Sequence, residues 1–221
     1  MPMEVQQAVD KLNTLLPLAA RQQQLDPELR QLHQLILRAF VEQGRPLPIT
    51  EAAGHLVQHS VQQAFRLLAQ QDLIVLDVEQ QMIMGAYPMT YEITPHIVEV
   101  NGHAINAMCA LDALAVAPMF GIATRIKSSC AISGEPVWIQ MHGEQVESLA
   151  APASLHVGIR WQSPCGAAAH SLCRDMVFLG GQEAVDKWQQ RSAVEGSVFD
   201  IPAAIAVGAT FFRPLLAAPE Q

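Results

Sequence analysis

Hydrophobic positions recur at helical spacing through the first third of the chain. The clearest pattern covers residues 26–43, which begin with an Asp-Pro pair and are followed by Gly44. This pair is typical of a helix start, and the glycine is typical of a helix end. Leucines at residues 12–16 indicate an earlier helix, a shorter pattern covers residues 50–57, and Ser60 precedes a further apolar face. These patterns predict an N-terminal part built from helices.

The hydrophobic period changes after residue 72, where the chain becomes strand-like. Residues 73–76 form a short apolar run, and residues 80–84 read as its hairpin partner. Helices followed by a two-stranded wing are the element order of a winged helix-turn-helix. We therefore expect residues 1–86 to form a winged-helix-like N-terminal module.

Charge argues against a DNA-binding role for this module. The helix after Ser60 has one arginine, Arg66, and the wing has Asp77 and Glu79 where basic residues would be expected. The whole chain has 13 Lys and Arg against 21 Asp and Glu, a net charge of -8. A protein that binds the phosphate backbone needs a basic surface. We therefore expect no DNA partner.

Short strands and turns dominate from about residue 87. Asn101-Gly102 stands between two apolar runs and predicts a tight hairpin. Short strands followed by helices are typical of an α+β fold, so we expect residues 87–221 to form a mainly antiparallel sheet domain flanked by helices. The patterns predict helices over residues 106–117, 182–191 and 201–216, and further strands near residues 124–127, 137–141, 154–161 and 176–179.

Composition predicts a soluble protein with a substantial core, because half of the residues are hydrophobic and no apolar run is long enough to span a bilayer. The first residues lack the basic start and apolar core of a signal peptide. We therefore expect a cytoplasmic protein without membrane contact. In that compartment the four cysteines should be reduced and should serve as ligands, nucleophiles or core residues.

The segment around Cys109 combines a thiol with a carboxylate. Asp112 follows Cys109 by three residues, so the two side chains would be neighbours on the predicted helix. A cysteine in an apolar helix is often only a small buried hydrophobe. However, an aspartate in an otherwise apolar segment needs a partner or a task. A soft ligand beside a proton-transfer group suits chemistry on a thiophilic metal.

The other candidate ligands form no recognisable zinc motif. Cys173 precedes an apolar strand, but no Cys-x-x-Cys pair occurs in the chain. His55 and His59 have a metal-binding spacing, yet a glycine and a predicted helix cap indicate that no single helix contains both. Phosphate-loop and Gly-x-Ser-x-Gly motifs are absent from the sequence, so nucleotide chemistry and serine hydrolysis have no support.

Three segments together resemble the bacterial organomercurial lyases, also called alkylmercury lyases. They are residues 108–114 with the Cys-Ala-Leu-Asp block, residues 129–137, and residues 171–173 before an apolar strand. The order and the separations of these segments also match the family. The resemblance covers about residues 91–216, and the N-terminal helices resemble the winged-helix-like module of the family.

The resemblance implies that Cys109 and Cys173 are catalytic thiols that bind mercury and that Asp112 is the proton-transfer residue. Members of this family cleave the carbon–mercury bond by protonolysis, giving a hydrocarbon and Hg(II), in mercury detoxification. Thiolates are the preferred protein ligands of soft Hg(II). Mercury is then substrate and product, no cofactor is expected, free thiols release the product, and a mercuric reductase is the expected acceptor of Hg(II).

This sequence departs from the family pattern at two positions. Arg174 stands where some members have a second cysteine, and it could either lower the pKa of the neighbouring thiol or lie at the surface, which we favour. Cys165 has no counterpart that we can assign, whereas Cys130 matches a family cysteine that we interpret as structural.

Two readings without catalysis remain as alternatives, a metal-responsive winged-helix regulator and a cysteine-based heavy-metal-binding protein. A regulator would need a basic DNA-binding surface, which the sequence lacks. A mercury scavenger would need only thiols, so the presence of Asp112 favours turnover.

Overall fold

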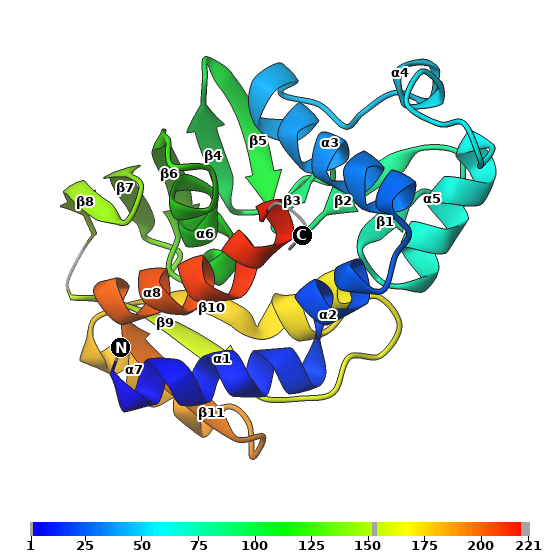
Figure 1. Ribbon diagram of the computed structural model, residues 1–221. Coiled ribbons are helices and arrows are strands. Elements are labelled where there is room, and N and C mark those ends of the chain that lie inside the picture. Colours follow the sequence, from blue (N-terminus) through cyan, green and yellow to red (C-terminus); the bar gives the residue numbers. More distant parts are fainter. Residues whose placement is uncertain (1, 152–153, 218–221) are drawn as a thin grey trace.

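The computed structural model describes residues 2–151 and 154–217; residues 1, 152–153 and 218–221 of the two expected domains lie outside the described residues. The chain forms a mixed α/β fold with a mainly antiparallel sheet, as expected (Figure 1). The larger sheet contains eight of the described strands in the order β1-β2-β3-β5-β4-β6-β7-β8, and three further strands pair in the order β10-β9-β11. The strands are β1 Ile74–Leu76, β2 Ile83–Ala86, β3 Met89–Thr90, β4 Ile97–Val100, β5 His103–Ala107, β6 Ala123–Ser129, β7 Pro136–His142, β8 Gln145–Ala150, β9 Leu155–Arg160, β10 Met176–Gly180 and β11 Gly196–Asp200.

Helices cover both sheets. The α-helices are α1 Met3–Leu15, α2 Leu18–Gln23, α3 Pro27–Gln43, α4 Ile49–Ala53, α5 Val61–Gln70, α6 Ala110–Phe120, α7 Gln182–Gln190 and α8 Ile201–Phe212. Short 3-10 helices are η1 Ala168–His170, η2 Leu172–Asp175 and η3 Arg213–Leu216. Within the described residues, no helix is both long enough and apolar enough to cross a membrane.

The N-terminal helices largely follow the sequence signals. The Asp26 carboxylate accepts a hydrogen bond from the Leu29 amide at the start of α3, and Gly44 ends this helix in the left-handed conformation. α4 is shorter than expected and ends at Ala53. The reason is that the amides of the following turn, near residues 57–58, donate to the Glu28 carboxylate and so leave the helical pattern.

The two expected wing strands belong to the larger sheet. β1 pairs with β2, and β2 continues by pairing with β3. The turn between β1 and β2 is closed by the Asp77 carboxylate, which accepts from the amides of Gln81 and Met82. Strands on both sides of residue 86 therefore lie in one continuous sheet. Helix α5 packs against β1 at one end of this sheet and α3 contacts β5, whereas α1 lies against α8 (Figure 1).

The second part of the chain contains the predicted Asn101-Gly102 hairpin, in which both turn residues have positive φ angles of 50° and 80°. Three of the described strands were not predicted: the two-residue strand β3, the fully exposed edge strand β8 and the strand β11. β8 shows no alternation between buried and exposed positions, which removes the period on which a strand prediction depends. The last helix ends at Phe212 and continues as a 3-10 turn that contains Pro214.

Helix α6 forms the centre of the molecule, because every residue from Ala110 to Met119 is buried. It packs against α8 on one side and against strands of both sheets on the other, and α1 lies on the far side of α8 (Figure 1). The expected helix start at residue 106 was wrong, because residues 103–107 form strand β5, which pairs with β4 and, at residues 106–107, with β3. The helix begins only at Ala110, and Cys109 is its N-cap.

Candidate active site

Three of the residues proposed from the sequence meet in the core. The thiol sulfurs of Cys109 and Cys173 and a carboxylate oxygen of Asp112 all lie within 4.8 Å of one another. All three side chains are buried, and they are 1%, 3% and 1% exposed, respectively. Among the described residues, this is the one group of three or more such side chains with metal-binding geometry.

The first thiol is placed by the start of α6. The Cys109 sulfur accepts a hydrogen bond from the Asp112 amide at 3.3 Å, so the cysteine caps the helix and Asp112 is its third residue. The two side chains are therefore neighbours, but not on one helical face as expected. The amide groups at a helix N-terminus favour negative charge, which suits both a thiolate and a carboxylate.

The second thiol arrives from a distant part of the chain. Cys173 lies in η2, directly before β10, and β10 packs against α6. Met176, the first residue of β10, places its thioether sulfur 3.7 Å from the Cys109 thiol. Packing of β10 on α6 therefore joins residues that are more than sixty positions apart in the sequence.

Burial favours the protonated forms of these three side chains. Burial raises the pKa of Asp112 to about 7, although the two neighbouring thiols act in the opposite direction. Burial also raises the pKa of Cys109 well above its ordinary value. The Cys109 thiol lowers the pKa of Cys173, but burial and the Asp112 charge outweigh this effect and raise it overall. An acid with a pKa close to neutrality can both accept and donate a proton at neutral pH.

One carboxylate oxygen of Asp112 has no hydrogen-bond partner among the described residues. A buried polar atom without a partner is unfavourable in a finished core. It is consistent with a group that acts on a bound molecule.

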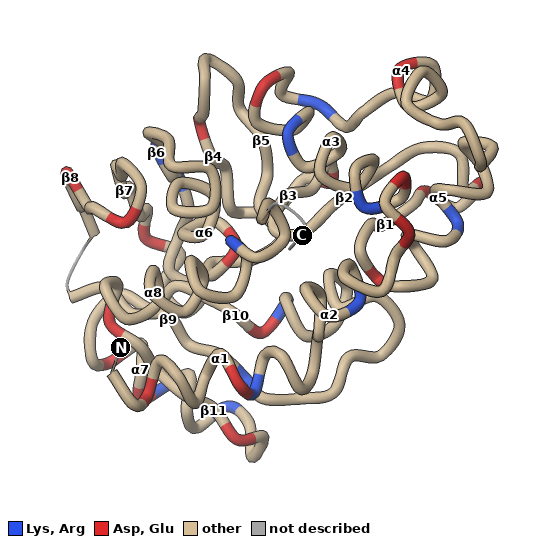
Figure 2. Tube along the Cα trace, viewed as in Figure 1, with Lys and Arg blue, Asp and Glu red and all other residues tan. Residues whose placement is uncertain are grey.

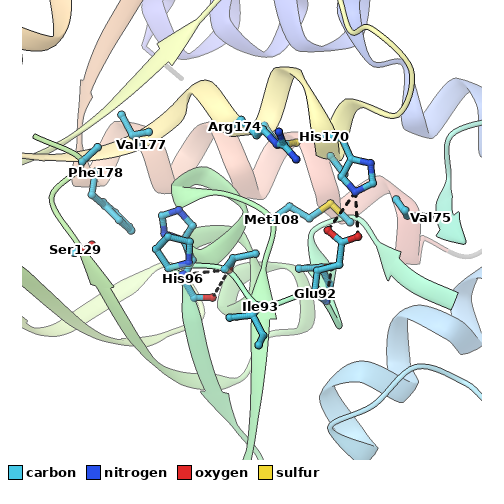
Figure 3. Close-up of a pocket in the computed structure, with 16 residues that line it drawn as sticks. Val75, Glu92, Ile93, His96, Met108, Ser129, His170, Arg174, Val177 and Phe178 are labelled. Carbon is cyan, nitrogen blue, oxygen red and sulfur yellow. Dashed lines mark hydrogen bonds and ion pairs between the residues drawn. The ribbon is translucent and has the colours of Figure 1, made fainter. Parts of the chain in front are cut away.

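A cavity of about 310 Å³ borders this group at Cys173, whereas Cys109 and Asp112 lie behind its lining. Cys173 and Met108 line it, together with His96 and Phe178. Figure 3 shows Arg174 and His170 along one side of the cavity and His96, Ile93 and Glu92 along the other. Most of the lining is apolar side chain or backbone, so the cavity suits a small molecule with a hydrophobic group.

Charged residues stand around the opening of the cavity. The His170 ring nitrogen lies 3.1 Å from a Glu92 carboxylate oxygen, and this pair crosses the cavity (Figure 3). Arg174 is exposed, as favoured from the sequence, but it also lines the cavity. Its guanidinium makes no ion pair with any residue in the described ranges.

The remaining candidates lie outside this group. Cys130 is buried in a separate cluster with Leu179 and Trp188, and its sulfur accepts from the Gly180 amide. Cys165 is an exposed free thiol, and its amide donates to Ser171.

The histidine pair also has a different role from metal binding. His59 pairs with the Glu28 carboxylate at 2.7 Å and has Asp26 at 3.7 Å, so it ties the turn after α4 to the start of α3. His55 follows α4 and joins no metal-binding cluster among the described residues.

Sequence reasoning missed the two methionines beside the thiols, although Met108 directly precedes Cys109. It also missed Tyr87 and Asp72, which contact the segment that contains Cys173. A carboxylate and a tyrosine in two loops give no periodic signal, so only the folded chain shows that they meet.

Comparison with known proteins identifies the family. The family model for MerB, alkylmercury lyase, matches residues 89–213, a range that contains Cys109, Asp112 and Cys173. The chain is 27% identical to the alkylmercury lyase of Staphylococcus epidermidis over 172 residues, 78% of this chain and 77% of that protein. It is 27% identical to the alkylmercury lyase of Streptomyces lividans over 180 residues, 81% of each chain, and 29% identical to that of Pseudomonas putida over 161 residues, 73% and 74%.

The fold agrees with this assignment. A solved structure described as the crystal structure of the mercury-bound form of MerB2 superposes with a TM-score of 0.77 and covers 98% of this chain and 100% of that chain at 18% identity. The family model spans more than half of the chain and includes the whole buried thiol and carboxylate group. The chain therefore belongs to the alkylmercury lyase family of enzymes.

Proposed function

We propose that this protein cleaves the carbon–mercury bond of organomercurials by protonolysis, with Cys109, Cys173 and Asp112 as the catalytic residues. The observation that supports this most directly is the approach of two thiols and one carboxyl group to within 4.8 Å in a buried site. The site is reached from an apolar cavity. Mercury is the substrate and product of this reaction and not a resident cofactor.

In the first step an organomercury thiolate enters the cavity and exchanges its thiolate for a protein thiol. A sulfur–mercury bond forms to Cys109, the incoming sulfur–mercury bond breaks, and the proton of Cys109 leaves with the released thiol. The Asp112 amide at the helix N-terminus stabilises negative charge on the Cys109 sulfur during this exchange and so offsets part of the pKa increase that burial causes.

In the second step the Cys173 sulfur binds the same mercury atom and gives its proton to Asp112. Two thiolates weaken the remaining bond to carbon because both donate electron density to the soft metal. Asp112 then returns the proton to the carbon atom, which takes the electron pair of the carbon–mercury bond and leaves as a hydrocarbon. Hg(II) stays between the two thiolates, and the protons and charges balance.

Release of the ion requires two further thiols from solution, which bind Hg(II) and return protons to Cys109 and Cys173. Both protein ligands are less than 4% exposed, so the accepting thiols must enter the site to take up the ion. We propose that a mercuric reductase accepts the ion and that the enzyme needs no cofactor of its own. We also propose that the protein acts in mercury detoxification and that it does so in the cytoplasm.

We also propose that residues 1–86 are a winged-helix-like module that has no DNA-binding role and that residues 87–221 form the catalytic domain. Basic residues are scattered along the chain and interspersed with acidic ones (Figure 2). Helix α5, which would enter the DNA groove, has a single basic residue, Arg66.

The test is release of methane from methylmercury in the presence of an excess of a small thiol, followed by gas chromatography. The wild type should turn over repeatedly, whereas Cys109→Ser and Cys173→Ser should release no methane. Asp112→Ala should keep two thiols for mercury but lose proton delivery, and we expect a fall in kcat of at least ~100-fold.

The matched control is Cys165→Ser, which removes an exposed thiol outside the site and should leave turnover unchanged. Methane release by either variant of the buried pair at the wild-type rate would show that the catalytic thiols were wrongly chosen. Unchanged turnover of Asp112→Ala would refute the proton-transfer step.

A further inference from the structure

A buried hydrogen-bond network connects the end of the N-terminal helices to the segment that contains Cys173. The Tyr87 hydroxyl donates to the Asp72 carboxylate at 2.8 Å and accepts from the Ala169 amide at 2.9 Å. The second carboxylate oxygen of Asp72 accepts from the Ala168 amide at 3.2 Å. Two consecutive amides of η1 are thus bound by side chains from a different part of the chain.

The segment held in this way has few other hydrogen bonds to the rest of the chain at its start, whereas its second half, η2, packs on β9 and β10. η1 and η2 form two successive 3-10 turns over residues 168–175, and such turns have weaker hydrogen bonds than an α-helix. The Ser171 side chain bonds within the same segment, to Cys165 and Ala167. Besides the packing of the buried Ala168 side chain, the polar contacts that hold the start of η1 to the rest of the chain are therefore the bonds to Asp72 and Tyr87 and the surface pair between His170 and Glu92.

The network contains two features that are unfavourable for folding by themselves: buried polar side chains and a left-handed backbone conformation at Asp72. Tyr87 is completely buried, and Asp72 is mostly so, with a side chain that is 18% exposed. Burial raises the pKa of Asp72 despite the hydrogen bond from Tyr87. Asp72 also has a φ angle of 51°, in the left-handed region that favours glycine. A glycine at this position would relieve the backbone but would remove the carboxylate that binds η1.

We propose that Asp72 and Tyr87 are positioning residues that hold the Cys173 segment against Cys109 and Asp112. The inference rests on the proposed function, because it assigns the second mercury ligand to a segment whose place depends on this network. It also gives the N-terminal part of the chain a role in the reaction. Asp72 lies two residues after the end of α5, so α5 positions the carboxylate that binds the Cys173 segment.

The test uses Tyr87→Phe, which keeps the buried ring and removes both hydrogen bonds. The matched control is Tyr91→Phe, which changes the other tyrosine of the chain, a residue that is 53% exposed. The first readout is the rate at which iodoacetamide alkylates each cysteine, resolved by mass spectrometry. We expect Cys173 to react at least ~10-fold faster in Tyr87→Phe while Cys109 reacts at its wild-type rate, because local opening frees only the second thiol.

The second readout is methylmercury cleavage by the same variants. We expect Tyr87→Phe to lower kcat about 10-fold with little change in KM, because misplacing one reacting group affects the chemical step more than binding. Asp72→Asn should show the same pattern, since the asparagine side chain has one accepting oxygen and its NH2 group cannot accept the second hydrogen bond. Tyr91→Phe should match the wild type in both readouts.

Equal alkylation of Cys173 in Tyr87→Phe and the wild type would overturn the inference. A parallel rise at Cys109 and Cys173 with a lower Tm would also overturn it, since it would show a general loss of stability. Alkylation does not depend on turnover. If the wild type released no methane but the selective rise at Cys173 were seen, the proposed function would fail and the positioning role would stand.

Discussion

At the scale of single residues, the raised pKa values of the site favour protonated side chains next to the position where the proposed reaction needs a proton. Burial favours the neutral forms of Cys109 and Asp112, and the two thiols near Asp112 only partly oppose this effect. A pKa of about 7 makes Asp112 an acid that can give up its proton to a carbon atom and regain it from a thiol. One Asp112 carboxylate oxygen has no hydrogen-bond partner among the described residues, so it is available for that transfer.

This elevated pKa should be visible in the stability of the protein. Asp112 has a pKa of about 7 in the folded chain against an ordinary value of 3.8, so the folded state binds the proton more tightly. The contribution of this group to stability is complete below pH 3.8 and is lost as the pH rises through 7. Asp112→Asn remains neutral, so it should exceed the wild type in unfolding free energy at about pH 8, by up to roughly 4 kcal/mol.

Urea unfolding at several pH values checks this prediction. The two proteins should be close in stability near pH 4 and should diverge as the pH is raised. Parallel curves across the whole range would mean that the carboxyl group is ionised in the folded protein.

At the scale of elements, the start of helix α6 decides the geometry of the site. Serine, threonine, aspartate and asparagine are the usual N-cap residues, whereas here a cysteine accepts the hydrogen bond from Asp112. The same sulfur thus stabilises the helix in the resting protein and binds mercury in the proposed reaction. Residues 97–107 form a hairpin, so the helix begins only at Ala110.

Two substitutions at position 109 separate these roles. Cys109→Ser provides an oxygen that accepts from the Asp112 amide, so its stability should equal or exceed that of the wild type although activity is lost. Cys109→Ala removes the cap and should lower the unfolding free energy by about 1 kcal/mol relative to Cys109→Ser. Thermal unfolding of the two variants side by side measures this difference, and equal Tm values would argue against the capping role.

At the scale of the whole molecule, a second buried network joins the N-terminal helices, the sheet and the C-terminal turn. His33 of α3 is bound to the Gln22 side chain at 2.7 Å and to the Leu73 carbonyl at 3.2 Å. Gln22 also donates to the Leu215 carbonyl in η3. Because the ring nitrogens have one acceptor and one donor as partners, a neutral histidine fits this position.

Two buried histidines, His33 of this network and His96 beside the cavity, should make the protein sensitive to acid. Burial lowers the pKa of His33 and of His96 to about 4 from 6.5, so the unfolded chain binds protons more readily than the folded one. Their stabilising contribution is present above pH 6.5 and is lost as the pH falls through 4, by roughly 3 kcal/mol for each group. The variant His33→Gln should lose part of this pH dependence in urea unfolding. An unchanged slope between these pH values would show that folding does not lower the pKa of His33.

The whole-molecule charge leads to a prediction about DNA. With a net charge of -8 and one basic residue on α5, the protein should not shift a duplex DNA fragment at roughly 10 μM protein and physiological salt. An electrophoretic mobility assay over a range of salt concentrations measures this. A shift that weakens steeply with salt would instead favour the regulator reading.

Much of the fold could be predicted because its signals are local. Asp26 with Gly44, Ser60 before α5, and the Asn101-Gly102 turn each act through neighbouring backbone groups, and each appears where expected. The errors lie where long-range pairing overrides local pattern. Residues 106–107 continue a strand because β3 and β4 lie beside them, and β11 pairs with β9.

The sequence by itself determined the family and proposed two thiols and an acid as its site, because the Cys-Ala-Leu-Asp block and the distant Cys173 are recognisable as linear motifs. Only the tertiary structure decided that Cys109 caps a helix, that β10 brings Cys173 within reach, and that the pKa of Asp112 rises to about 7. These properties come from burial and from contacts between residues far apart in the chain. No local pattern encodes them, since they exist only once the core has closed around the site.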